Sequence, residues 1–218
     1  MSLARATRSS RGSRFVSHLG VAVVVGLVVG ACASDPSVVD RGCSAVGKAR
    51  ADLDGDAVLD SVSLAWNEER GAAVLSVCTA RGVGAELEVA GQAEYLETVD
   101  IQSDGHAEIL AGGTTAGAAL ATMYVLAGDR LVPVRFADGT ELGVAEGFDA
   151  QGPKYEWTCA SGPAGGPPRT LVLRERSSAT AWHVRTVAVD GASARVIEER
   201  DVARSTSPED GDIALHAC

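Results

Sequence analysis

Short β-rich runs separated by turn residues are the feature that most constrains how this chain can fold. Helical periodicity is nearly absent from the sequence. Runs rich in Val, Leu, Thr and Tyr, bounded by Gly, Asp, Asn and Pro, are typical of strands joined by tight turns. The expected strands are 61–66, 73–79, 85–89, 107–111, 119–126, 131–136, 154–159, 170–174, 181–189 and 194–199.

The connections between these runs carry the turn signals of antiparallel strands. Segments 67–71, 127–129, 137–139 and 190–191 combine Gly with Asp or Asn. The Gly- and Pro-rich segment 160–169 is a further expected loop. A turn roughly every 8–12 residues predicts an all-β fold, namely a small antiparallel β domain of propeller-blade-like or sandwich architecture.

The first 31 residues divide into the parts of an export signal. Residues 1–18 contain four arginines and no acidic residue, and an apolar run of 13 residues follows at 19–31. This run is shorter than the roughly 20 residues that cross a bilayer as a helix. It ends in Val29-Gly30-Ala31-Cys32, which resembles the lipobox of bacterial lipoproteins. The resemblance implies cleavage before Cys32 and acyl chains such as palmitate attached through its thiol; an ordinary signal peptide with an incidental cysteine is the alternative.

This N-terminal pattern divides the chain into three parts. Residues 1–31 are expected to be a lipoprotein signal peptide, residues 32–42 a lipidated tether, and residues 43–218 a β-rich domain. Each buried methylene of an acyl chain contributes about 0.8 kcal/mol, so paired chains anchor a protein without a transmembrane helix. We therefore expect the domain on the extracytoplasmic face of the bacterial cell membrane.

The mature chain is strongly acidic. The whole sequence has 19 basic and 29 acidic residues and a formal net charge of −10 at pH 7. Four of the basic residues belong to the signal, so the mature chain has a formal net charge of −14. Nucleic acid and anionic lipid headgroups are poor partners for such a surface, whereas cations are suitable ones.

Four cysteines remain after Cys32, and an even number in an exported chain predicts disulfide bonds. They are Cys43, Cys78, Cys159 and Cys218, for which three connectivities are possible. We favour Cys43–Cys78 and Cys159–Cys218, because each pairing closes a loop within one half of the chain. Each bond would contribute about 3–4 kcal/mol by restricting the unfolded state.

Segment 52–60 has the pattern of a calcium-binding loop. Carboxylates stand at its first, third, fifth and ninth positions, which are Asp52, Asp54, Asp56 and Asp60. Calcium takes six to eight oxygen ligands, and a backbone carbonyl at the seventh position, that of Val58, would join the set. Neighbouring carboxylates repel one another unless a cation lies between them. We therefore predict a structural Ca²⁺ site here, with simple turn formation as the alternative.

A second copy of this pattern follows 48 residues later, at 100–108. Its corresponding positions hold Asp100, Gln102, Asp104 and Glu108, which are all oxygen donors. Both copies lead directly into β-rich stretches, and this shared context predicts an internal repeat. The second loop is the weaker calcium candidate, because a neutral amide replaces one carboxylate.

The two units resemble FG-GAP and VCBS repeats, whose members carry a DxDxDGxxD-like calcium loop before a strand. The resemblance covers 45–70 and 94–112, and a third unit follows at 155–175, where small residues and prolines replace the acidic ones. It implies three pseudo-repeats, near 45–98, 94–150 and 151–218. Ala57 stands where the family pattern has Gly, so a positive φ there would cost about 1 kcal/mol.

Candidate catalytic patterns are scarce in this sequence. It contains no HExxH or GxSxG pattern, and His106 is interpreted as a solvated turn residue. The glycine-rich segment 112–117 lacks the ending of a phosphate-binding loop and is interpreted as a hairpin turn. We assign Trp66, Trp157 and Trp182 to the core rather than to a sugar-stacking surface, because the chain has few aromatic residues.

These features predict a lipid-anchored cell-envelope protein without enzymatic activity, whose calcium-stabilised β domain serves binding or structural display. Its expected partners are the membrane, through the lipid, and a protein or cell-wall glycan, but not nucleic acid. An envelope hydrolase with acids on scattered loops is one alternative. A disulfide-bound scaffold whose repeats no longer bind metal is another.

Overall fold

The computed structural model describes residues 48–115, 118–149, 152–162, 165–166 and 169–203. They belong to the second of two compact units, Val39–Cys218. The predicted signal peptide and tether, together with Cys32, Cys43 and Cys218, lie outside the described residues. Within the described part, no helix is long and apolar enough to cross a membrane.

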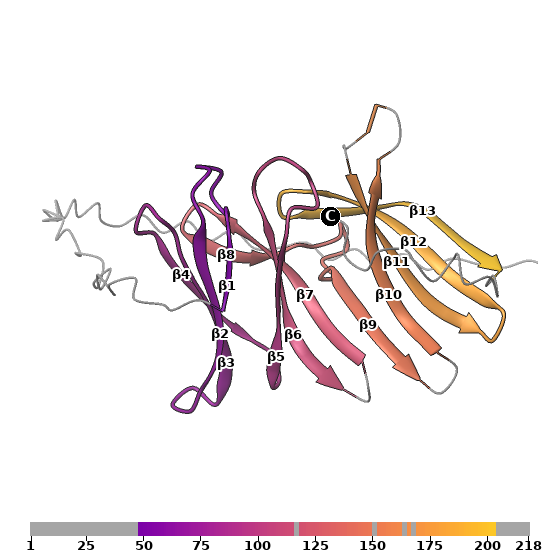
Figure 1. Ribbon diagram of the computed structural model, residues 1–218, viewed down its shortest axis with the longest axis horizontal. Helices are drawn as coiled ribbons and strands as arrows, with labels where there is room; N and C mark the ends of the chain where they lie inside the picture. Colours follow the sequence, from indigo (N-terminus) through magenta and orange to yellow (C-terminus); the bar gives the residue numbers. More distant parts are fainter. Residues whose placement is uncertain (1–47, 116–117, 150–151, 163–164, 167–168, 204–218) are drawn as a thin grey trace, which may run out of the picture. The chain divides into compact units, whose positions relative to one another are not determined.

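The described chain is all-β and antiparallel, as predicted (Figure 1). Strands β1–β4 form a four-stranded sheet in chain order. The other strands form a nine-stranded sheet in the order β13-β12-β11-β10-β9-β7-β6-β5, with β8 paired to β7. The strands are β1 (Ala49–Ala51), β2 (Asp60–Asn67), β3 (Ala72–Cys78), β4 (Gly84–Val89), β5 (Ala93–Val99), β6 (Glu108–Thr115), β7 (Ala118–Ala127), β8 (Arg130–Pro133), β9 (Gly143–Asp149), β10 (Gly152–Ser161), β11 (Arg169–Ser178), β12 (Ala181–Asp190) and β13 (Ser193–Ala203).

Ten of these strands overlap an expected one, and β1, β5 and β9 are additional. β1 has three residues, β5 carries two glutamates and β9 contains two glycines, so none has a strong β pattern. β8 ends at Pro133, short of the expected 131–136. The chain there turns, with the N–H of Val134 bonded to Met123 and the N–H of Leu142 bonded to Val134.

Three successive four-strand meanders build the domain. β1–β4, β5–β8 and β10–β13 each pair in chain order, and β9 joins the second meander to the third by pairing with β7 and β10. The acidic segments 52–59 and 100–107 connect the first strand of a meander to its second. The Gly- and Pro-rich segment expected in place of a third acidic loop falls at the same connection, between β10 and β11. The strand topology thus repeats together with the sequence pattern.

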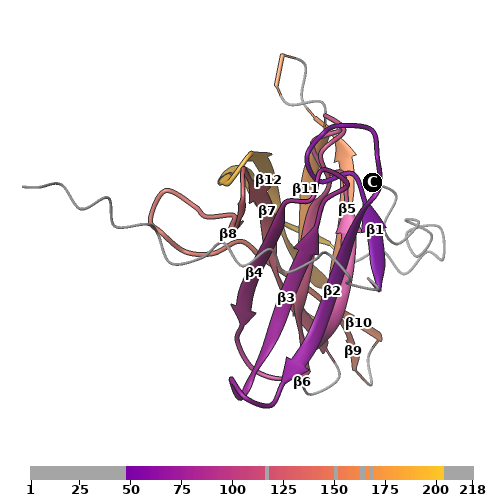
Figure 2. The ribbon, with the colours of Figure 1, turned by 90° about the vertical axis from the view of Figure 1, so that its left-hand side faces the viewer.

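The four-stranded sheet packs against strands β5–β8 (Figure 2), and the first hydrophobic core lies between them. Alternate residues of β2 face it, so that Val62 and Leu64 are buried. Leu75 from β3 and Ile109 from β6 are fully buried beside them. Burial of one such side chain contributes about 1.5–3 kcal/mol, and the shared core therefore holds the two sheets together.

The second core uses the alternate residues of the same central strands. Leu110 of β6 and Met123 of β7 are fully buried in it, one residue along from the first-core residues Ile109 and Tyr124. Trp157 of β10 packs in this second core together with side chains of β11 and β12. Strands β6 and β7 are thus buried on both faces and connect the two cores.

Two glycines of β6 allow close backbone contacts. The segment 112–117 was expected to be a hairpin turn, and it does contain the connection between the antiparallel strands β6 and β7, in which Thr115 pairs with Ala118. Gly112 and Gly113, however, lie within β6. A Cβ on Gly112 would lie 1.9 Å from the backbone oxygen of Leu120, and one on Gly113 would lie 2.6 Å from that of Gln92. Gly112 and Gly113 therefore allow close strand packing.

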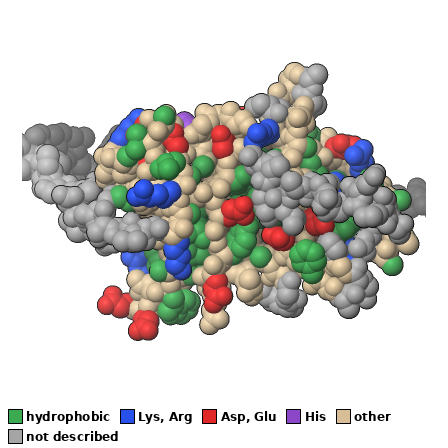
Figure 3. All heavy atoms as spheres, in the orientation of Figure 1, with side chains coloured by type: hydrophobic (Ala, Val, Ile, Leu, Met, Phe, Trp, Pro, Cys, Tyr) green, Lys and Arg blue, Asp and Glu red, His purple; other side chains and the backbone are tan. Residues whose placement is uncertain are grey.

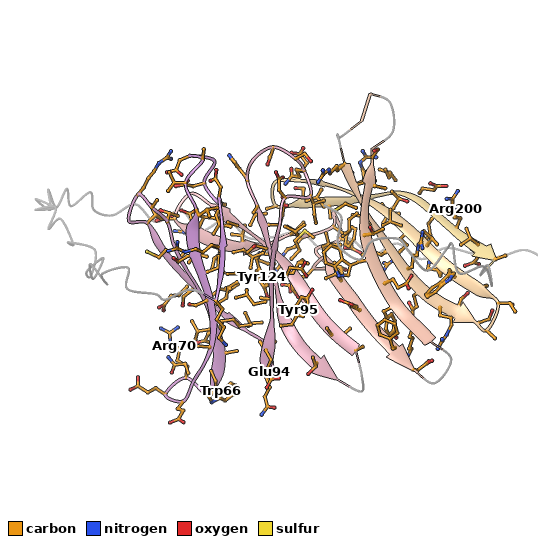
Figure 4. All side chains as sticks on the ribbon, viewed as in Figure 1. Trp66, Arg70, Glu94, Tyr95, Tyr124 and Arg200 are labelled. Carbon is orange, nitrogen blue, oxygen red and sulfur yellow. The ribbon has the colours of Figure 1, made fainter. Side chains whose placement is uncertain are left out.

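The tryptophan assignment is correct for two residues and wrong for the third. Trp157 and Trp182 are buried, but Trp66 is 52% exposed. It follows Leu64, the last buried residue of β2, and so stands beyond the end of the core. Figure 4 shows it at the end of the four-stranded sheet that also carries Arg70.

We predict that Gly112→Ala destabilises the domain by about 1–3 kcal/mol, because the added methyl group collides with backbone that cannot move freely. Urea unfolding measures the change. Gly84→Ala is the matched control, since the closest atom to its Cβ lies at 4.0 Å. Equal midpoints for the two variants would contradict the close approach at Gly112.

Candidate metal-binding loops

The first acidic loop, 52–59, is anchored by a buried carboxylate. Leu53 belongs to the first core, and its N–H donates to Oδ2 of Asp60 at 2.8 Å. Asp60 is 1% exposed, and its Oδ1 accepts the N–H of Ala80, in the β3–β4 turn, at 2.8 Å. One carboxylate thus fixes the loop to a neighbouring turn.

Asp52 organises the tip of the loop. Its Oδ1 accepts the N–H groups of Gly55 at 2.7 Å and Asp56 at 3.2 Å, and its Oδ2 accepts the N–H of Ala57 at 2.7 Å. Desolvation acts to raise the pKa of Asp52, but the three N–H bonds outweigh it and lower the pKa below its usual value. The carboxylate is therefore ionised at neutral pH.

The backbone of the loop is left-handed at two positions. Gly55 has a φ of 72° and Ala57 a φ of 61°. Ala57 thus has the positive φ that was considered for this position, where the repeat pattern has Gly. The conformation costs an alanine about 1–2 kcal/mol, and the bond from its N–H to Asp52 helps to hold it there.

Three of the predicted ligands converge in this loop. One carboxylate oxygen from each of Asp52, Asp54 and Asp60 lies within 4.8 Å of the others. Oδ1 of Asp54 is buried and has no hydrogen-bond partner in the structure. Its other oxygen, Oδ2, lies 3.7 Å from Nη1 of Arg81. A buried oxygen without a partner is costly, so this atom marks the position where a ligand would stabilise the loop.

Asp56 lies outside this group. Its Oδ1 accepts the N–H of Val58 at 2.8 Å, and its Oδ2 pairs with Nε of Arg81 at 3.1 Å. Arg81 stands in the β3–β4 turn and brings a positive charge to the loop. No sequence signal marks Arg81, because it lies in a separate turn beyond the motif. A ligand role for the carbonyl of Val58 stays a prediction.

The second acidic loop, 100–107, repeats four hydrogen bonds of the first. In both loops, N–H groups at the second, fifth, sixth and seventh positions donate to carboxylates at the ninth, first, first and fifth positions. In the second loop the donors are Ile101, Asp104, Gly105 and His106, and the acceptors are Glu108, Asp100 and Asp104, at 2.8–3.2 Å. The two loops are therefore structural copies as well as sequence copies.

The copies differ at the third position. Nε2 of Gln102 donates to Oε1 of Glu108 at 2.6 Å, and Oε1 of Gln102 accepts the N–H of Gly191 at 3.2 Å. Among the described residues, Asp52, Asp54 and Asp60 form the acidic group with metal-ligand spacing, and the carboxylates of the second loop do not form another. Gln102 and Glu108, both predicted as ligands, instead bond to each other.

The two loops are in direct contact. The N–H of Ala107 donates to the backbone oxygen of Asp52 at 2.7 Å. The ring of His106 lies against Gly55, where a Cβ would come within 1.9 Å of Nε2. His106 is exposed, as a turn residue was expected to be, but it also packs one loop on the other.

A groove of about 620 Å³ lies among the β4–β5 connection and strands β6, β7 and β9. Small residues line much of it, including Gly112, Gly113 and Gly143. Its acidic residue, Glu141, is paired with Nη2 of Arg135 at 2.6 Å. This lining offers contact surface, and its carboxylate is already neutralised by a cation.

The side chain of His183 in β12 bonds to two acidic residues of the edge strand β13. Nδ1 of His183 lies 3.0 Å from Asp201, and Nε2 lies 2.9 Å from Glu199. The hydrogen bonds to Asp201 and Glu199 raise the pKa of His183 above its usual value. Figure 3 shows basic and acidic side chains interspersed over one face of the molecule.

The described cysteines lie in different sheets. Cys78 ends β3, and Cys159 lies in β10 against the second core. The partners predicted for them, Cys43 and Cys218, are outside the described residues. Both pairings therefore stay predictions.

Comparison of the chain with protein-family models, curated proteins and solved structures gives no match.

The burial of Glu108 predicts a pH dependence of folding. Burial raises its pKa from 4.5 to about 7, although hydrogen bonds from Gln102 and Ile101 act in the opposite direction. A raised folded-state pKa means that this contribution to stability is complete below about pH 4.5 and is lost as the pH rises through about 7, a change of about 3 kcal/mol.

Urea unfolding between about pH 5 and 8, with chelator present, measures this dependence. Glu108→Gln removes the titrating group and should flatten the curve, while His183 contributes equally to both proteins. The same slope in the variant and the parent would contradict the assignment.

Proposed function

We propose that this chain is a lipid-anchored cell-envelope protein whose first acidic loop binds calcium and thereby stabilises a β domain used for binding or display. The carboxylates of Asp52, Asp54 and Asp60 are the protein ligands in this proposal. The ion has a structural task.

The observation that carries the proposal is the environment of Asp54. Its Oδ1 is buried without a hydrogen-bond partner, and one oxygen of the same carboxylate lies within 4.8 Å of carboxylate oxygens of Asp52 and Asp60. A folded chain retains such an arrangement at a cost, because the oxygen is desolvated and its neighbours repel it. A cation would remove both costs at once.

The chemistry of the donor set favours calcium. Carboxylate oxygens are hard ligands, and Ca²⁺ accepts six to eight oxygens in flexible geometry. Arg81 supplies one positive charge to Asp54 and Asp56 from a largely exposed position. A divalent ion would compete with that guanidinium for Asp56, and the carbonyl of Val58 and water would complete the coordination.

The contacts of the loop indicate that an ion there would stabilise more than the loop itself. Leu53 and Asp60 tie the loop to the first core and to the β3–β4 turn. The contact between Ala107 and Asp52 ties it to the second loop. An ion that orders 52–60 therefore supports two meanders.

The lipobox and the repeats supply the rest of the proposal. Anchoring through Cys32 would hold the domain on the extracytoplasmic face of the membrane, where weak calcium sites with dissociation constants of about 10⁻⁴–10⁻³ M can fill. Three meanders, two with an acidic loop before the second strand, support the resemblance to FG-GAP and VCBS repeats. A protein or cell-wall glycan is the proposed partner, and the groove beside β6, β7 and β9 offers a contact surface.

We predict that calcium raises the thermal midpoint of the full chain in detergent, compared with the same chain in excess chelator. At a Ca²⁺ concentration 100 times the dissociation constant, the gain is about 2.7 kcal/mol. Asp54→Asn should abolish the difference, whereas Asp129→Asn, at an 83% exposed side chain, should preserve it. Coinciding midpoints with and without calcium in the parent chain would refute the proposed site.

We predict that Cys32→Ser releases the chain from the membrane fraction of a bacterium that processes lipoproteins. Radiolabelled palmitate should enter the parent chain and not this variant. Cys43→Ser is the control and should keep both the label and the membrane location. A labelled, membrane-bound Cys32→Ser protein would rule out lipidation at this residue.

A further inference from the structure

The two acidic loops share four hydrogen bonds, and this similarity makes the residues that differ between them easy to compare. Four backbone-to-carboxylate bonds occur at the same positions in each. Each loop also has a positive φ at its fourth position, in Gly55 and in Ser103. The two backbones are therefore closely similar, although the Gly55 N–H bond to Asp52 and the ion pairs of Arg81 belong to the first loop alone. Among the predicted ligands, the third residue changes most, from the carboxylate of Asp54 to the amide of Gln102.

Gln102 uses both ends of its amide. The Nε2 group donates to Glu108, which is 1% exposed, and the Oε1 atom accepts the N–H of Gly191. Glu108 therefore has both carboxylate oxygens occupied, one by Ile101 and one by Gln102. In the first loop, by contrast, the third residue, Asp54, has a buried oxygen, Oδ1, without a hydrogen-bond partner.

We infer that Gln102 decides which loop takes up a cation: its amide closes the second loop in place of an ion, so that the chain binds one calcium ion and not two. This inference rests on the proposed function and deepens it. Gln102 acts as a specificity-determining residue, since a neutral amide whose Nε2–H donates to Oε1 of Glu108 stands where the first loop has the carboxylate of Asp54.

The second loop then has a different task from the first. Gly191 lies in the β12–β13 turn, so Gln102 joins the second meander to the third across 89 residues of sequence. The neighbouring backbone pairs of Arg135 with Ala192 and Ala194 bring the same turn against the 134–142 segment. The first loop holds an ion, and the second braces a turn of the next meander.

Isothermal titration of the full chain in detergent with CaCl₂ tests the inference through its stoichiometry. The expected values are one ion for the parent chain, none for Asp54→Asn and two for Gln102→Asp, which restores a carboxylate at the third position. Gln92→Asp adds the same charge outside both loops and should stay at one. Two ions in the parent chain, one ion that survives Asp54→Asn, or no more than one in Gln102→Asp would each overturn the inference.

Hydrogen exchange in excess chelator separates the inference from the proposed function. Gln102→Ala should speed the exchange of the Gly191 amide by about tenfold, because that amide loses its acceptor. The Leu53 amide, bonded to Asp60, should keep its rate. If the parent chain binds no calcium but the Gly191 amide exchanges faster in Gln102→Ala, the proposed function is wrong, while the contact between Gln102 and the β12–β13 turn is supported. An unchanged exchange rate at Gly191 would overturn the role of Gln102 in holding this turn, whatever the titration shows.

Discussion

A buried carboxylate at the start of a meander's second strand is the constraint on which this domain depends. Asp60 and Glu108 are each 1% exposed, and each accepts the N–H of the second residue of its loop. A buried carboxylate that loses its donors costs several kcal/mol, so the loop cannot easily detach. Because Leu53 and Ile101 are core residues, the same bond sets how β2 and β6 enter their cores.

Two levels of contact follow from that constraint. The hydrophobic cores share β6 and β7, so the three meanders are continuous through their centre. Hydrogen bonds at the loops also connect successive meanders. The N–H of Ala107 donates to the backbone oxygen of Asp52, and the N–H of Gly191 donates to Oε1 of Gln102. Each loop must also balance its own negative charge. The first recruits Arg81 and leaves one oxygen of Asp54 without a partner, whereas the second uses a neutral amide.

Local patterns were sufficient for most strands and for both loops, since strand alternation, turn residues and carboxylate spacing are encoded within a few residues. Ala57 has a positive φ at the position where the repeat pattern has Gly. The misses have non-local causes. Trp66 is exposed because the core ends before it. The glycines of β6 are required by the close approach of backbone from β7 and from the β4–β5 connection. No local pattern places Arg81 on the first loop or Gly191 on the second.

Anomalous diffraction from crystals of the chain grown with calcium would locate an ion bound at either acidic loop. We expect one ion per chain, with oxygens of Asp52, Asp54 and Asp60 at about 2.3–2.6 Å, and a second loop still closed by Gln102. The Asp54 oxygen would then have its missing partner. An ion bound only at the second loop, or a first loop without an ion at millimolar calcium and with Asp54 still facing Arg81, would contradict this expectation.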